Sequence, residues 1–391
     1  MLRDLFDTSM SVGAVFNVVH EAVVAAREIN ARQDLSRVRI GAHDEIFQNR
    51  RPVLVGADAD STYCYLLAAE DHRDADTWGI HLLDLADQGL RPEATIADGG
   101  TGLRAAQKLV WPSVPCRADV FHAQRDVGQL ATYLENRALG VMTMRDTLER
   151  RMVRAKRRGQ GKTVSKKLAL ARQREAVAVG LADDVAVLAT WLQADVLVLA
   201  GPDIATRREL FDFIVEELRA RELLCPHRIG PVRRMLENQR DDLLAFAEVL
   251  DGKIAALATE FQVAPEHVRS VLALHAANPK RTERWHDEAE LRGQLGGRFY
   301  GLFEATAELA RDTVRASSVI ENVNSRLRPY FFLRREIGPA YLDLLRFFLN
   351  HRTFLRSERP EREGRSPAEI LAGEPHPHWL SLLGFERFRR N

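Results

Sequence analysis

Two aspartates stand in short apolar runs where their carboxylates could do chemistry. Asp44 lies within VRIGAHDEIF, and Asp98 closes EATIAD just before two glycines. Carboxylates on neighbouring strands suit a hard divalent cation such as Mg²⁺, which prefers oxygen ligands. Three interpretations of Asp98 are open: a metal ligand, part of a phosphate-binding loop, or a turn or helix-capping residue. The phosphate loop is disfavoured, because no Lys-Ser/Thr follows DGGTG and the G-x-G-x-x-G spacing is absent.

The alternation of the first run indicates the direction of the Asp44 side chain. In a strand, Ile40, Ala42 and Asp44 project from the same face. A carboxylate on an apolar face is costly unless it is hydrogen-bonded or holds a metal. Glu45 is then expected on the opposite face, in a solvated or structural role.

Seven segments must position these residues. Their periodicities predict three β-strands first, followed by crossovers. The expected order is strands 38–47, 52–58 and 62–70, helix 74–90, strand 93–98, helix 101–111 and strand 115–121. Such an order predicts an α/β domain whose sheet begins antiparallel and becomes parallel. Upstream, residues 11–33 read as one helix with Ser11 as its N-cap.

From about residue 129 to 312 strand patterns nearly vanish and amphipathic helices follow one another. Residues 315–357 read as two helices split near Pro329. The polar, Pro-rich tail 358–377 is expected to lie over the surface.

The overall charge is uninformative, since Lys and Arg number 56 and Asp and Glu 55. The range Arg145–Arg174 is different, with twelve basic residues against two acidic ones. It is either a solvated helix face or a surface that contacts nucleic-acid phosphates. Three scattered cysteines fit a reducing cytosol and give no zinc spacing. No membrane span and no secretion signal are expected, which favours a cytoplasmic location.

Four motifs, in order, resemble those of bacterial insertion-sequence transposases of the DDE type. They are HDEIF, IADGGTGL, ADVFHAQRDV and SSVIENVNSRLRPYF, and GRSPAEIL is similar to the closing segment of such enzymes. The resemblance extends from about Ser11 to Leu371. It implies a ribonuclease-H-like core with a mixed five-stranded sheet, interrupted by a large all-α insertion. The implied segments are a helix-turn-helix remnant (1–36), the first part of the core (37–128), the insertion (129–312) and C-terminal core helices with a tail (313–391).

The resemblance assigns the catalytic, metal-binding carboxylates to Asp44, Asp98 and Glu321. Asp58 and Asp60 compete for the first position, but the Asp-Glu pair on the opening strand favours Asp44. For Glu321, the alternative is a solvated residue on an amphipathic helix.

Further residues are expected to support the site. Asp119 and His122 match an Asp-x-x-His element that lies beside the active site in such families, although a buried structural histidine is an equal alternative. Asn324 and Arg328 share a helical stripe with Glu321 at i+3 and i+7.

DNA contacts are expected from positive groups and one aromatic residue. The candidates after the third acid are Arg326, Arg328, Arg334 and Arg335, and those in the basic stretch are Arg157, Arg158 and Lys162. Trp285 stands among charges and could stack on a displaced base, the alternative being a core anchor.

The function that the resemblance implies is metal-dependent strand cleavage and strand transfer at insertion-sequence ends. Two Mg²⁺ ions, with Mn²⁺ as a substitute, would be held by the three carboxylates, and no covalent enzyme intermediate is needed. The implied partners are double-stranded DNA, as transposon ends and target, and a second copy of the chain in a homodimer. No membrane partner is expected, and the location would be the nucleoid of a bacterial cytoplasm.

Two alternatives stay open. One is a catalytically inactive or truncated DNA-binding derivative, because only the second half of a helix-turn-helix is recognisable near the amino terminus. The other is a nuclease or resolvase on the same core.

Overall fold

The computed structural model describes residues 11–97, 100–159, 161–313, 318–333, 337–357 and 359–386. Contacts divide the chain into two compact units. The first contains Met1–Asp119 with Ala316–Asn391, and the second contains Val120–Arg315. Among the helices that the structure describes, none has a segment long and apolar enough to cross a lipid bilayer.

The first unit contains one mixed sheet of five strands in the order β3-β2-β1-β4-β5. The strands are β1 (Ile40–Gln48), β2 (Arg51–Asp58), β3 (Cys64–Ala69), β4 (Ala94–Ala97) and β5 (Cys116–Ala118). The pairs β1/β2 and β2/β3 are antiparallel, whereas β1/β4 and β4/β5 are parallel. The predicted α/β class and the change from antiparallel to parallel pairing are therefore confirmed.

A tight hairpin between β1 and β2 fixes the direction of Asp44. Its two loop residues, Asn49 and Arg50, have φ of 49° and 70°, as the left-handed turn of a two-residue hairpin requires. The resulting register pairs Asp44 with Val55. Because side chains alternate along a strand, a slip of one residue would move Asp44 to the other face of the sheet.

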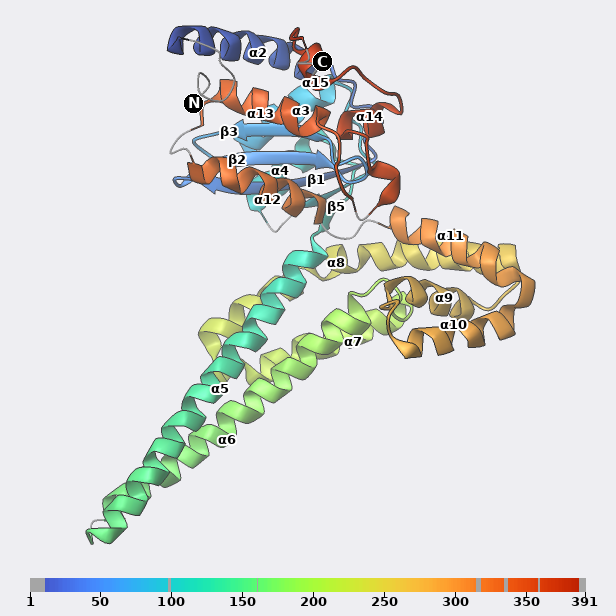
Figure 1. Ribbon diagram of the computed structural model, residues 1–391. Coiled ribbons are helices and arrows are strands. Elements are labelled where there is room, and N and C mark those ends of the chain that lie inside the picture. The colour runs from blue at the N-terminus through green and yellow to red at the C-terminus, as the bar shows by residue number, and fades with distance from the viewer. Residues whose placement is uncertain are drawn as a thin grey trace. The chain divides into compact units, whose positions relative to one another are not determined.

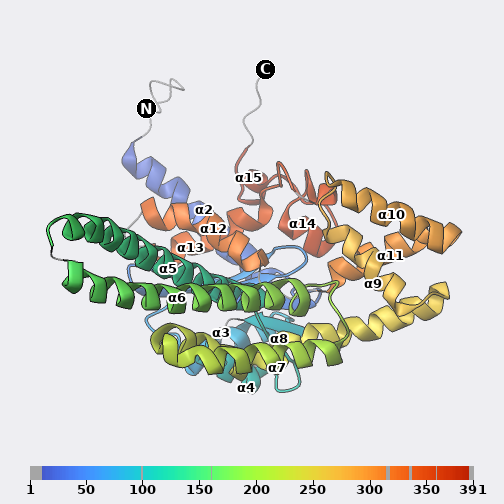
Figure 2. The ribbon, with the colours of Figure 1, turned by 90° about the horizontal axis from the view of Figure 1, so that it is seen from below.

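Helices cover both faces of this sheet (Figures 1 and 2). On one face lie α3 (Ala75–Asp87) and α4 (Thr101–Val110), and on the other α12 (Ser318–Leu333) and α13 (Pro339–His351). Strand β2 serves both layers: Leu54 belongs to the core with α3 and α4, and Val53 and Val55 to the core with α12 and α13. The period of two therefore gives one strand two apolar faces.

Two boundaries differ from the sequence prediction. The strand predicted to reach residue 121 ends at Ala118, and α5 begins at Val120. The apolar alternation continues through Val120, but an aspartate at 119 favours the start of a helix. The predicted split at Pro329 is also wrong, because α12 continues through Pro329 to Leu333.

Three more helices complete the described part of the first unit: α2 (Val12–Arg32), α14 (Pro367–Ala372) and α15 (Trp379–Leu382). As predicted, α2 is one helix that Ser11 caps, since the Ser11 hydroxyl accepts a hydrogen bond from the Ala14 amide at 3.0 Å. Its second half packs on α13 through Ala26 and Phe347.

Helix α13 also covers the outer edge of strand β3. The Asn350 carboxamide accepts from the Cys64 amide and donates to the Cys64 carbonyl, both at 2.8 Å. The Arg346 guanidinium donates to the Tyr65 carbonyl at 2.9 Å. An edge strand offers unpaired backbone groups, and here side chains of α13 bind some of them.

The second unit is helical, and its described residues contain no strand, as predicted for 129–312. Its helices are α5 (Val120–Arg157), α6 (Gly161–Trp191), α7 (Ile204–Arg221), α8 (Pro226–Phe261), α9 (Pro265–Ala276), α10 (Thr282–Leu295) and α11 (Phe299–Asp312). Helices α8 to α11 share one apolar core. Helices α5 and α6 form a long antiparallel hairpin.

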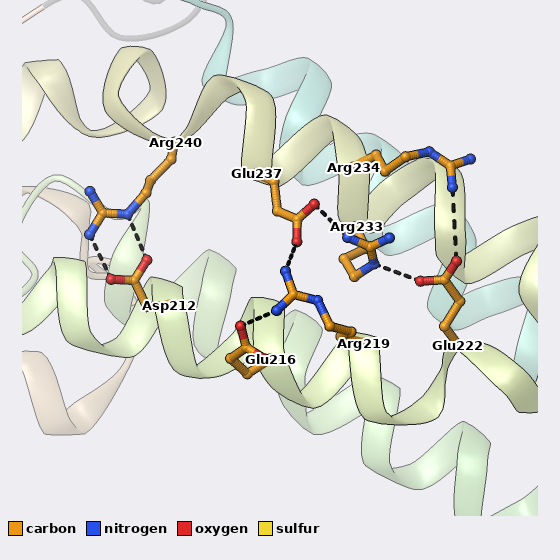
Figure 3. A network of polar contacts seen from close by, with 8 residues as sticks. All are labelled: Asp212, Glu216, Arg219, Glu222, Arg233, Arg234, Glu237 and Arg240. Carbon is orange, nitrogen blue, oxygen red and sulfur yellow. Dashed lines mark hydrogen bonds and ion pairs between the residues drawn. The ribbon is translucent and has the colours of Figure 1, made fainter.

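Ion pairs join α7 to α8 in this unit (Figure 3). The Arg240 guanidinium donates two hydrogen bonds of 2.6 Å to Asp212. Farther along the same two helices, Arg219 and Arg233 both bind Glu237. Such a connected network holds its members in place better than isolated surface pairs do.

A buried arginine fixes the segment before α7. The Arg207 side chain is fully buried and donates hydrogen bonds to backbone carbonyls of residues 196–202. Its guanidinium also lies over the Phe246 ring of α8, 5.4 Å from the ring centroid. Because a buried cation needs such partners, Arg207 joins this loop to the helical core.

Candidate metal centre

Asp44 is buried on the face of the sheet that α12 covers. Only 8% of its surface is exposed, and its strand neighbours Ala42 and Ile46 belong to the core with α12 and α13. The predicted direction of this side chain is therefore confirmed. One carboxylate oxygen accepts from the Glu45 amide at 2.8 Å, and the other from the Asn324 carboxamide at 2.7 Å.

Helix α12 brings Glu321 to the same place. Its apolar stripe, Ile320, Val323 and Leu327, is fully buried against the sheet. Glu321 and Asn324 are three residues apart, and such residues are neighbours on a helix surface. Because Asn324 binds Asp44, the helix holds Glu321 next to the carboxylate of Asp44.

Distances among potential ligand atoms define a candidate cation site. One carboxylate oxygen of Asp44 and one of Glu321 lie within 4.8 Å of each other, and a ring nitrogen of His122 falls within the same limit. His122 stands in the first turn of α5, where the second unit begins, and is half-buried. We therefore rest the site on Asp44, Glu321 and Asn324, which all belong to the first unit.

The donor set within the first unit suits a hard cation. It offers two carboxylates, and it also contains the Asn324 carbonyl oxygen, which is buried without a hydrogen-bond partner among the described residues. An unsatisfied buried oxygen is costly in an empty site. Mg²⁺ and Mn²⁺ take carboxylate and carbonyl oxygens as ligands, so these residues fit the cation that the sequence implied.

Arg328 supplies the nearest positive charge on α12. A guanidinium nitrogen of Arg328 lies 3.6 Å from a Glu321 oxygen, and 68% of the Arg328 side chain is exposed. Arg326, in contrast, points toward α13, where it donates to the Leu349 carbonyl at 3.4 Å. Burial lowers the pKa of the Arg326 guanidinium.

Glu45 occupies the opposite face, as predicted, and has a structural role. Its carboxylate accepts from the Trp78 indole nitrogen at 3.1 Å and from Arg73 at 2.6 Å. Trp78 is fully buried in the core with α3 and α4. Successive carboxylates in one strand therefore belong to two different environments.

The competing aspartates have other partners. Asp58 closes the turn after β2, where its carboxylate accepts from the Ser61 amide at 2.7 Å and from the Ser61 hydroxyl at 2.6 Å. Burial raises the pKa of Asp58. The Asp60 side chain is 85% exposed and lies near Arg359 and Arg362.

Several predicted site residues lie outside the described residues: Asp98, Arg334 and Arg335. The strand before Asp98 is described, and β4 ends at Ala97, which pairs with His43 of β1. Asp119 directly precedes α5, is 2% exposed, and its amide donates to the Ala97 carbonyl at 3.1 Å.

The remaining candidates lie in the second unit. Arg157 ends α5, Arg158 lies in the turn that follows, and Lys162 lies in the first turn of α6, and all three are exposed. Trp285 is on α10 with 61% of its surface exposed. An indole that exposed contributes little to a core, so its exposure disfavours the core-anchor alternative.

Sequence reasoning placed Asn324 beside the site but did not foresee its hydrogen bond to Asp44. The stripe of Glu321, Asn324 and Arg328 was the only available signal. No signal in one sequence gives the contact itself, because 280 residues separate Asn324 from Asp44.

Comparison with known proteins adds no assignment. No protein-family model matches the chain, and no curated protein matches it in sequence.

Proposed function

We propose that this chain is a metal-dependent DNA strand-cleaving and strand-transferring enzyme of the DDE transposase type. The observation that carries the proposal is the proximity of Asp44 and Glu321. They are 277 positions apart in the sequence (321 minus 44), yet their carboxylate oxygens lie within 4.8 Å. A fold gains nothing from two adjacent carboxylates unless a cation or a proton lies between them.

The organisation of the chain supports the same proposal. The order β-β-β-α-β-α-β and the mixed sheet are those that a ribonuclease-H-like core would have. The helical unit Val120–Arg315 stands in the chain between β5 and α12, where a transposase insertion would stand. In this proposal α2 is the remnant of a helix-turn-helix, and the enzyme acts on transposon ends and target as a homodimer.

Three residues of the first unit would bind the cation and position one another. Asp44 and Glu321 would be its ligands, and the Asn324 amide would hold the Asp44 carboxylate in one orientation. The turn of α12 that separates Asn324 from Glu321 keeps the second ligand in register with the first. A bound divalent cation supplies Lewis acidity for activating a water or a DNA 3′-hydroxyl and for stabilising the leaving oxygen.

Asp98 is the proposed third carboxylate. The parallel pair of His43 with Ala97 brings the end of β4 level with the residue before Asp44. In parallel sheets the carboxyl ends of neighbouring strands share one edge, and ligands bind there.

The test is cation-dependent nicking of supercoiled plasmid that carries the element's ends. Wild type should nick in Mg²⁺ or Mn²⁺ and not in EDTA, and Asp44→Asn, Asp98→Asn and Glu321→Gln should each abolish nicking. Asp60→Asn is the matched control, because it removes an exposed carboxylate from the same sheet and should leave nicking unchanged.

The products separate the alternatives. Nicked ends that also join to target DNA identify a transposase, whereas nicking without joining identifies a nuclease. If the wild-type protein nicks no faster than Glu321→Gln under all cation conditions, the catalytic proposal is wrong, and the DNA-binding alternative takes its place.

A further inference from the structure

The positive charges of the α5–α6 hairpin are distributed unevenly along its length. Of the twelve basic residues in Arg145–Arg174, two are paired: Arg145 binds Glu175, and Arg172 binds Glu149, both at 2.8 Å. These pairs lie on the side of the hairpin away from the turn. For the other ten (twelve minus two), no ion pair is found in the parts of the chain that the structure describes, and all ten are exposed.

The charged end of the hairpin extends beyond the rest of its unit. The fully buried residues of α5 end with Ala138, although the helix continues to Arg157. At a rise of 1.5 Å per residue, the last nineteen residues extend about 28 Å. In both views α5 and α6 lie side by side up to the turn (Figures 1 and 2). We call this part, residues 139–180, the arm.

A hollow at the turn of the arm collects the strongest charge. Its lining includes Arg151, Arg154, Lys156, Arg158 and Lys162, together with the glycines of the turn, Gly159 and Gly161. Gly159 has a φ of +73°, a conformation that glycine adopts without strain, and it allows the chain to reverse within a few residues. Five cationic side chains around one hollow would repel each other unless an anion lies between them.

From this distribution we infer that the arm binds the phosphate backbone of duplex DNA, independently of base sequence and of the metal centre. The inference rests on the proposed function only in taking DNA as the partner. The arm would hold DNA by its charge while the first unit acts on a strand. A length of about 28 Å corresponds to roughly eight base pairs at 3.4 Å each, so several basic groups can contact phosphates together.

Arginine content and the lack of an apolar face favour DNA over a lipid surface. The guanidinium group forms paired hydrogen bonds with phosphate oxygens, and most basic residues around the turn are arginines. A helix that lies on a membrane needs a continuous apolar face. Among the large apolar side chains of the arm, the exposed ones, Met144, Val153, Leu170 and Val177, are separated by charged and polar residues.

The test is fluorescence anisotropy with labelled random-sequence duplex, in EDTA, over a range of NaCl concentrations. A variant with Arg154, Arg157, Arg158 and Lys162 all replaced by Gln should reduce the slope of log K against log [salt] by about 3 to 4, because each phosphate contact contributes about 0.9. The control variant Arg154→Lys, Arg157→Lys and Arg158→Lys keeps the charge and should keep the wild-type slope. All replaced residues are exposed, so circular dichroism should show unchanged helix content.

Each outcome bears on one inference alone. An unchanged slope in the Gln variant overturns the role of the arm, whatever the nicking assay gives. Stronger binding to vesicles rich in anionic lipid than to DNA at the same salt concentration also overturns it. Wild-type slope and affinity in Glu321→Gln would support independence from the metal centre. If nicking fails in wild type while the Gln variant loses its slope, the proposed function falls and the arm remains a DNA-binding element.

Discussion

Replacing Glu321 with Gln should stabilise the cation-free protein, although most substitutions in a fold destabilise it. The carboxylate oxygens of Asp44 and Glu321 lie within 4.8 Å of each other. Two unit charges at that distance repel each other by about 3.5 kcal/mol at an effective dielectric constant of about 20, and by about 0.9 kcal/mol in bulk water. Asp44 is 8% exposed and the Glu321 side chain 22%, so we expect an intermediate value of roughly 1–3 kcal/mol.

Arg328 offsets only a small part of this repulsion. Its side chain is 68% exposed, and exposed ion pairs contribute about 1 kcal/mol or less. The first unit has 195 residues (119 plus 76), a size at which 1 kcal/mol shifts the melting temperature by about 2–4 °C. Glu321→Gln should therefore raise the melting temperature of this unit in EDTA by about 2–10 °C.

Cation addition should reverse the order of the two proteins. A cation that binds only the folded state adds about 2.7 kcal/mol of stability at 100 times its dissociation constant. Wild type should gain this increment in Mg²⁺ or Mn²⁺, and Glu321→Gln should lose most of it because one ligand is gone. Thermal unfolding followed by circular dichroism measures both effects, and Asp60→Asn should behave as wild type does.

Two results would refute this reasoning. A lower melting temperature for Glu321→Gln than for wild type in EDTA would mean that the carboxylate is stabilising without a cation. An equal cation-induced shift in the two proteins would mean that the cation binds elsewhere.

Three further predictions concern stability and DNA contact. Burial lowers the pKa of His43 and of His351 from 6.5 to about 4, so the unfolded chain takes up these protons first. Stability should therefore fall as pH decreases from about 6.5 toward 4, by roughly 3 kcal/mol for each histidine, and a urea midpoint that stays constant across this window would contradict the assignment. Asn350→Ala leaves the buried amide and carbonyl of Cys64 without these partners and should cost about 2–5 kcal/mol in urea unfolding, whereas a loss below about 0.5 kcal/mol would show that water replaces the carboxamide. Trp285→Ala should leave stability within about 0.5 kcal/mol and weaken single-stranded DNA binding by about 1–3 kcal/mol, and unchanged affinity in a filter-binding assay would exclude stacking on this ring.

Local patterns in the sequence predicted the sheet and the direction of its first acid. Alternation in β1 gave opposite faces to Asp44 and Glu45, and the structure gives them separate partners, Asn324 on one side and Trp78 on the other. Such predictions succeed because strand periodicity is a local property of the chain.

Other features depended on contacts that no local pattern encodes. The hydrogen bond from Asn324 to Asp44 spans 280 positions. Pro329 reads as a helix break in the sequence, yet α12 contains it, because the buried stripe of α12 that packs on the sheet continues on both sides of Glu321 and outweighs the lost backbone donor. Tertiary packing of an apolar face supplies most of the stability of a helix, so local propensity alone misplaces its end.

The order of the elements along the chain has a consequence for biosynthesis. The five strands are complete at Ala118, but α12 and α13 are synthesised only after the helical unit Val120–Arg315. At about 5–20 residues per second, those 196 residues take roughly 10–40 s. During this time one apolar face of the nascent sheet lacks its cover, and the edge of β3 lacks the Asn350 clamp. Ribosome-bound chains that end before α12 should therefore be the species most prone to aggregate and most dependent on chaperones.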